Sequence, residues 1–243
     1  IAQRVQPELC ILTGDILDGR PFDCCASDAW RDAILALTEP LVALGCQFTF
    51  CPGNHDDDES PWKRSDLLQI FDLPGCISRG ALSFDHTFTV SSNSSSLIRL
   101  LIFDSGGNDP VYRYGTFSHD AVEGCKETLQ KNGHEVKTLC FCHIPLPEVA
   151  GLVPLVGSHN LFDAALAAGM LPRPLQWVSG LLRLLGLHRR VHGISKLNSG
   201  LFHALSKSSV VQAVFFGHDH HSDSVYKRAG IYLCYGRVGS ITP

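Results

Sequence analysis

Four short apolar segments of this 243-residue chain each lead into polar residues that can bind a metal ion, and this pattern limits the possible folds. Segments of this length and composition are typical of buried strands. In an open α/β sheet, ligands bind beyond the carboxyl ends of the strands. The segments cover residues 9–13, 46–51, 136–142 and 210–216, and they lead into Gly14-Asp15, Gly53-Asn54-His55-Asp56, His143 and Gly217-His218-Asp219-His220, respectively.

Helical patterns separate several of these strands. Ser27 is suited to cap a helix with apolar residues every three or four positions, and Pro40 is expected to kink or split it. Ser60-Pro61 and Ser118 predict two further helix starts, while the alternating pattern over residues 82–103 predicts antiparallel strands. Strands alternating with helices predict an α/β fold with some antiparallel pairing.

The converging residue types favour a metal centre. Asp15 offers a carboxylate able to bridge two ions, Asn54 offers an amide oxygen, and the histidines offer imidazoles. Mixed nitrogen and oxygen ligands suit Zn, Fe or Mn rather than Ca. Gly14, Gly53 and Gly217 are expected to let the backbone turn sharply before each ligand.

Composition excludes several other classes. The net charge of −4, with no run of Lys or Arg, argues against nucleic-acid binding through phosphates. No apolar run reaches the roughly 18 residues of a membrane-spanning helix. The ten cysteines contain no CxxC pair, which argues against a thiolate zinc site, and several lie in apolar runs. Buried, reduced thiols are therefore expected, which favours the cytoplasm.

The motifs together resemble the calcineurin-like metallophosphoesterases, whose signature is GD, then GNH(D/E), then a single His, then GHxH. Residues 141–148, 197–202 and 215–220 also resemble the purple-acid-phosphatase-related branch of plants and fungi. The resemblance covers nearly the whole chain except an expected insertion at about 155–193. It implies a metallo-dependent phosphatase-like α/β fold, a two-sheet β-sandwich with flanking helices.

The resemblance also implies roles for individual residues. Asp15 would bridge two metal ions, and His220 would bind the second ion. His55 would protonate the leaving oxygen, oriented by Asp56, while a hydroxide between the metals attacks phosphorus. The first ion would be held by Asn54, His143 and His218.

Two features depart from the family pattern. The family opens with a DxH motif, but none of the thirteen residues before Gly14 is Asp or His, and the sequence 233–237 looks like the start of a longer motif. We therefore expect residues 1–243 to be a single domain that is incomplete at both ends and binds one metal well and the second poorly. Asp18 stands where purple acid phosphatases have a Tyr, so no purple iron band is expected.

The predicted activity is hydrolysis of phosphate monoesters, with a phosphorylated small molecule or a phosphoprotein as substrate. Two alternatives remain: a phosphodiesterase of the cyclic-nucleotide type, and a non-catalytic interaction platform. Asp57, Asp58 and Glu59 are expected to form a solvated loop face, and Asp104 is not assigned to the site.

Overall fold

A computed structural model gives the three-dimensional structure. It describes residues 2–16, 27–58, 62–78, 86–91, 97–131, 136–152, 154–155, 193–220 and 222–236. Most of the predicted insertion at about 155–193 lies outside these residues, as do Asp18, Glu59 and the predicted helix start at Ser60-Pro61.

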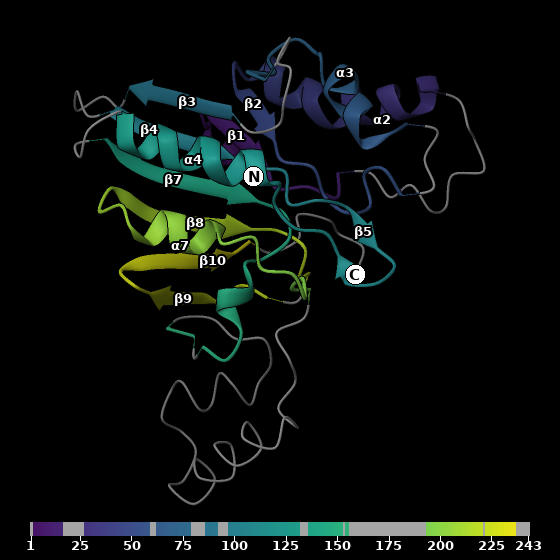
Figure 1. Cartoon of the computed structure of the whole chain (residues 1–243). Helices are drawn as coiled ribbons and strands as arrows, with labels where there is room; N and C mark the ends of the chain where they lie inside the picture. The colour runs from purple at the N-terminus through teal and green to yellow at the C-terminus, as the bar shows by residue number, and fades with distance from the viewer. Residues whose placement is uncertain are drawn as a thin grey trace, which may run out of the picture.

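The centre of the molecule is a six-stranded sheet with the order β3-β4-β7-β8-β10-β9 (Figure 1). Its four inner strands are mutually parallel, and each edge strand pairs antiparallel with its neighbour. The parallel arrangement brings the carboxyl ends of the inner strands to one edge of the sheet. The strands are β3 (His86–Ser91), β4 (Leu97–Ile102), β7 (Lys137–Cys142), β8 (Val211–Phe216), β9 (Val225–Arg228) and β10 (Ile231–Tyr235).

A second, two-stranded sheet packs against the first. It consists of β1 (Leu9–Leu12) and β2 (Gln47–Phe50), which are parallel and in register from Leu9 with Gln47 to Leu12 with Phe50. Side chains alternate between the two faces of a strand, so Leu9 and Ile11 of β1 point the same way. They join a cluster with residues of the six-stranded sheet: Ile98, Leu100, Ile102, Leu139 and Phe141.

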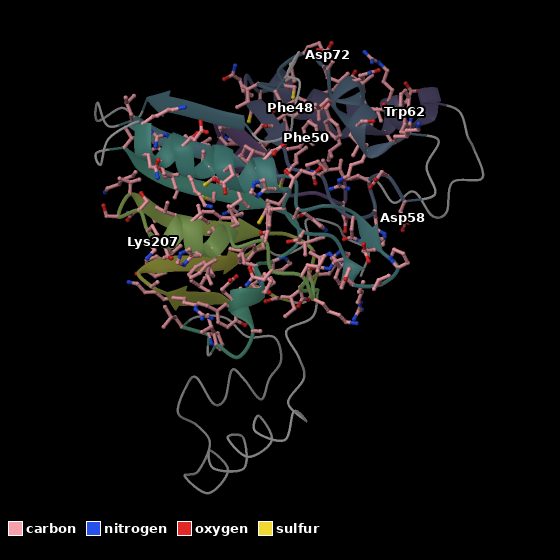
Figure 2. The ribbon with its side chains drawn as sticks, in the orientation of Figure 1. Phe48, Phe50, Asp58, Trp62, Asp72 and Lys207 are labelled. Atoms are coloured by element: carbon pink, nitrogen blue, oxygen red, sulfur yellow. The ribbon has the colours of Figure 1, made fainter. Side chains whose placement is uncertain are left out.

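Helices cover the outer faces of both sheets, which confirms the predicted α/β fold with flanking helices. In Figure 1, α4 (His119–Lys131) and α7 (Leu201–Ser206) cover the six-stranded sheet, where Cys140 and Cys142 lie in the core. On the other side, α2 (Ser27–Ala43) and α3 (Leu67–Ile70) pack over β2. Phe48 and Phe50 of β2 are labelled in Figure 2, and both are fully buried in the cluster formed with these helices.

Several elements differ from the sequence-based expectation. Pro40 lies inside α2, which continues to Ala43. Within the helix expected to start at Ser60-Pro61, the described residues form the 3-10 helix η1 (Arg64–Asp66) followed by the short α3. The hairpin of β5 (Asn108–Asp109) and β6 (Arg113–Tyr114) was not predicted. Ser118 does precede a helix and accepts a hydrogen bond from Ala121 N at 3.0 Å. The remaining short elements are α1 (Ala2–Val5) and η2 (Pro147–Val149).

Eight cysteines fall within the described residues, and all eight are free thiols, six of them buried. The six buried thiols agree with the expectation that cysteines in apolar runs lie in the core. Among the helices described, none combines the length and apolar character that crossing a bilayer requires.

Candidate metal centre

The loop after β1 places Asp15 through an unusual backbone conformation. Gly14 has φ of +90° and Asp15 has φ of +49°, both in the left-handed region. For a residue other than glycine this conformation carries strain, which folds retain mainly at functional sites. The Asp56 carboxylate stabilises the turn by accepting hydrogen bonds from Asp15 N at 3.1 Å, Ile16 N at 2.7 Å and Gly53 N at 2.7 Å. Asp56 thereby joins the loops that follow β1 and β2.

Four potential ligand atoms meet around the buried ring of His143, which directly follows β7. The Nε2 atom of His143 lies 3.0 Å from Asp15 Oδ2. It also lies 3.1 Å from Asn54 Oδ1 and 3.1 Å from His218 Nδ1. These residues follow four different strands, so the fold unites ligands that are up to 203 positions apart in the sequence (218 − 15).

Hydrogen bonding alone does not satisfy this cluster. The Nδ1 atom of His143 lies 2.7 Å from the Thr13 carbonyl, which can only accept, so Nδ1 carries a proton. In a neutral ring, Nε2 then presents a lone pair toward two oxygen acceptors. Even a protonated ring offers one Nε2 hydrogen to three neighbours. A cation satisfies all four atoms together, and metal-binding histidines usually donate their other ring N–H to a carbonyl or carboxylate, as Nδ1 of His143 does here.

The electrostatics agree with a cation site. Burial raises the pKa of Asp15, but the hydrogen bond and charge of His143, with the His55 backbone N–H, outweigh it and lower the pKa to about 2. Burial and then the neighbouring His143 lower the pKa of His218 to about 3. At neutral pH, therefore, Asp15 is an anion and His218 is a neutral imidazole with a free lone pair, which are the forms that bind metals. Asp15, His143 and His218 have ligand atoms within 4.8 Å of one another.

Close backbone packing is needed to bring the loops together. A Cβ atom at Gly53 would overlap the backbone N and Oδ1 of Asp15, and one at Gly217 would overlap the Thr13 carbonyl. Of the three glycines expected to allow sharp turns, only Gly14 has a positive φ. At the other two positions, the structure requires the absence of a side chain because two loops touch there.

The unpredicted β5–β6 hairpin lies beside the candidate metal ligands Asn54 and His218. Asn108 in β5 accepts a hydrogen bond from Asn54 Nδ2 at 3.1 Å and donates to the Asn54 carbonyl at 3.2 Å. This pair directs Asn54 Oδ1 toward His143. Tyr114 in β6 packs edge-on against the His218 ring, with 4.6 Å between ring centroids. Strands of two residues have no measurable periodicity, so no sequence signal indicated the hairpin.

Comparison with known proteins shows which family the chain belongs to. A family model described as calcineurin-like phosphoesterase matches residues 1–222. The chain belongs to this family. It is therefore a metal-dependent phosphoesterase, a hydrolase of phosphoric esters that acts on phosphorylated substrates.

One solved structure that resembles this phosphoesterase is the crystal structure of a dimetal phosphatase from Danio rerio. The likeness covers 97% of this chain and 74% of the other, with a TM-score of 0.58 and 15% sequence identity. At this identity the likeness shows a shared fold. No curated protein sequence matches the chain.

The acidic residues after His55 have more specific contacts than a solvated loop face would have. His55 Nδ1 lies 3.0 Å from Asp58 Oδ2, and both side chains are 25% exposed. Asp58 is labelled in Figure 2, on the loop after β2. Asp56, which was expected to orient His55, has both oxygens engaged by backbone N–H groups instead. Asp57 and Asp104 both contact Arg64. The expectation for Asp57 and Asp58 was therefore wrong, because both carboxylates face a cationic or imidazole partner.

His220 is not part of the group of converging ligand atoms. Its side chain is exposed, and the group is formed by Asp15, His143 and His218. In the preceding turn, His218 has φ of +68° and packs against Gly193, where any Cβ would overlap the His218 ring. The contact between Gly193 and His218 was not predicted, because it joins residues 25 positions apart that carry no shared motif.

Proposed function

We propose that this phosphoesterase hydrolyses phosphate monoesters at a metal centre in which Asp15, Asn54, His143 and His218 hold one ion. The observation that carries the proposal is the meeting of three ligand atoms on His143 Nε2 while His143 Nδ1 is bound to a carbonyl. We further propose a second ion, bridged by Asp15 and bound by His220. Nitrogen and oxygen ligands favour Mn, Fe or Zn.

His55 supports the proposal as the general acid. Its backbone N–H donates to Asp15 Oδ1 at 2.8 Å, so its ring is tied to the loop that carries the metal ligands. Asp58 holds the Nδ1 side of the ring, which leaves Nε2 to donate a proton to the leaving oxygen. Bound metal ions would supply Lewis-acid stabilisation of the phosphoryl oxygens and would lower the pKa of a bound water.

The proposal extends to the branch of the family. The sequences 141–148, 197–202 and 215–220 resemble the purple-acid-phosphatase-related proteins of plants and fungi. Two of these stretches contain the proposed ligands His143, His218 and His220. Reduced, buried cysteines favour a cytoplasmic location for such a protein.

The test compares two model substrates after metal reconstitution. The protein is stripped with a chelator, loaded separately with Mn²⁺, Fe²⁺ or Zn²⁺, and assayed with p-nitrophenyl phosphate and bis-p-nitrophenyl phosphate. We expect faster cleavage of the monoester, and loss of both metal and activity in Asp15→Asn. His203→Ala, an exposed histidine on α7, is the matched control and should retain both.

Each alternative predicts a different result. Preferential cleavage of the bis-ester would replace monoester hydrolysis with phosphodiester hydrolysis. Metal binding without cleavage of either ester would overturn the catalytic proposal and favour an interaction platform. Full activity in Asp15→Asn would overturn the proposed metal centre.

A further inference from the structure

Arg64 lies at the start of η1, eleven residues after Gly53, and its mostly buried guanidinium makes an unusually complete set of contacts. The Nε atom donates to both oxygens of Asp104, at 3.0 and 2.9 Å, and Nη2 donates to Asp104 Oδ1 at 2.6 Å. Nη1 donates to the Gly53 carbonyl at 2.9 Å and to Asp57 Oδ1 at 2.8 Å, while Nη2 reaches the Pro52 carbonyl at 3.3 Å. The one N–H on Nε and the two on each terminal nitrogen therefore all have acceptors.

Three of these contacts are to the loop that carries the proposed metal ligand and the proposed acid. Pro52 and Gly53 directly precede Asn54 and His55, and Asp57 follows them. Pro52 and Gly53 are buried, so their carbonyl oxygens need a donor from within the protein. Arg64 supplies that donor before the functional residues and bonds to the Asp57 carboxylate after them.

Asp104 connects this contact to the rigid sheet. It follows β4 by two residues and also accepts a hydrogen bond from Gly106 N at 2.8 Å. Gly106 begins the turn into the β5–β6 hairpin, whose Asn108 pairs with Asn54. Ser105, between Asp104 and Gly106, accepts a hydrogen bond at 2.9 Å from the backbone N–H of Ile144, the residue that follows His143. The segment 104–106 therefore braces the Asn54 loop, the Asn108 hairpin and the residue after His143.

We propose that Arg64, held by Asp104, is a positioning residue that fixes the loop 52–57 so that Asn54 and His55 are in place before metal and substrate bind. This inference rests on the proposed function. A planar guanidinium suits this role because its five donors have fixed directions, whereas the ammonium of lysine is a compact charge with three donors. Ligands held in place beforehand avoid the entropy cost of ordering a loop when the metal binds.

The test uses Arg64→Lys, which keeps the charge, and Arg64→Met, which removes it. We measure Mn²⁺ affinity, amide hydrogen exchange at residues 53–58 in the metal-free protein, and kcat and KM separately. We expect Arg64→Lys to weaken Mn²⁺ binding about tenfold, the lower end of the roughly 10–100-fold loss that follows removal of a group supporting a metal ligand. Exchange at 53–58 should accelerate, and kcat should fall more than KM rises.

Two further variants separate positioning from general stability. Asp104→Asn keeps one acceptor oxygen, so it should weaken Mn²⁺ affinity, accelerate exchange at 53–58 and lower kcat, each by less than the Arg64 variants do. It also provides a second test if Arg64→Met does not fold. Lys126→Met removes the cation of the half-exposed pair with Glu123 on α4 and should change none of them. If Arg64→Lys and Asp104→Asn lower the melting temperature but leave Mn²⁺ affinity, loop exchange and kcat unchanged, the inference is overturned.

The outcome is independent of the proposed activity. Metal affinity and amide exchange need no turnover, so a wild-type protein that fails to hydrolyse p-nitrophenyl phosphate overturns the proposed function alone. Unchanged exchange and affinity in the Arg64 variants overturn the positioning role alone.

Discussion

Asn54 and Asn108 form a reciprocal amide pair: Asn54 Nδ2 donates to Asn108 Oδ1 at 3.1 Å, and Asn108 Nδ2 donates to the Asn54 carbonyl at 3.2 Å. Because the Asn54 amide nitrogen is engaged in this way, its oxygen faces His143 Nε2. The orientation of a proposed metal ligand thus depends on an exposed residue of a short hairpin.

Replacement of Asn108 should therefore weaken metal binding. In Asn108→Leu the Asn54 amide is free to rotate, and we expect metal affinity to fall roughly tenfold. Asn108→Asp retains the oxygen that accepts from Asn54 Nδ2, so its metal affinity should fall less than that of Asn108→Leu. Titration with Mn²⁺ measures the effect, and Gln69→Leu, an exposed amide on α3, is the control. Equal affinity in Asn108→Leu and wild type would contradict the orienting role.

Asp58 should matter for turnover more than for metal binding. Its carboxylate lies 3.0 Å from His55 Nδ1 and orients the ring. In Asp58→Asn we expect kcat to fall about tenfold or more while metal content stays the same, because the acid itself remains and only its orientation is lost; general acid catalysis as a whole contributes roughly 10²–10⁴-fold. Steady-state kinetics with metal analysis test this, with the exposed Asp32→Asn on α2 as the control. A normal kcat would exclude Asp58 as the partner of His55.

Two glycine-to-alanine substitutions should have opposite effects on stability. Gly53→Ala forces a methyl group into Asp15, so we expect a loss of about 1–3 kcal/mol and of metal binding. Gly124 lies exposed in the middle of α4 with open space around it, so Gly124→Ala should gain about 0.5–1 kcal/mol. Urea unfolding measures both. A stable, metal-binding Gly53→Ala protein would show that the two loops do not need this close contact.

The cysteines should react with alkylating agents in an order set by burial. Burial, followed by nearby charges and thiols, raises the pKa of Cys51 and Cys142 well above the usual range, and the thiolate is the reactive form. Cys10 and Cys234 are only half-buried and should react first with iodoacetamide in the native protein. Mass spectrometry of timed samples tests the order. Early labelling of Cys51 would mean that the loop beside the metal centre opens readily.

The metal-free protein should lose stability as the pH falls. His218 has an ordinary pKa of 6.5 and a lowered pKa of about 3 in the fold, because burial and His143 disfavour its cation. Between these two pKa values the unfolded chain binds a proton at His218 and the folded protein does not. The contribution of His218 to the free energy of unfolding is therefore complete above about pH 6.5 and declines toward pH 3. We expect His218→Asn to have a flatter dependence of unfolding free energy on pH over this range. Parallel curves for the two proteins would contradict the shift.

The positions of several strands in the sequence were predictable, because they follow from local patterns. Apolar segments before Gly14, Pro52, His143 and Gly217 indicated strands, and the polar residues after them indicated a metal centre at their carboxyl ends. Ser118 before α4 gave an equally local signal, since a cap bonds to a nearby backbone N–H. Pro40 does not split the helix, since α2 continues past it to Ala43.

What the sequence by itself determined is therefore the four strands that lead into the motifs, the family motifs themselves and the ligand types. Only the tertiary structure decided which partners hold those ligands: Asp58 beside His55, Asn108 beside Asn54, and Arg64 with Asp104 behind the loop. The physical reason is the separation in sequence between the residues that interact. Strand and cap signals arise between neighbours in the chain, whereas Asn108 and Asp104 reach their partners across 54 and 40 positions through packing that no local pattern encodes.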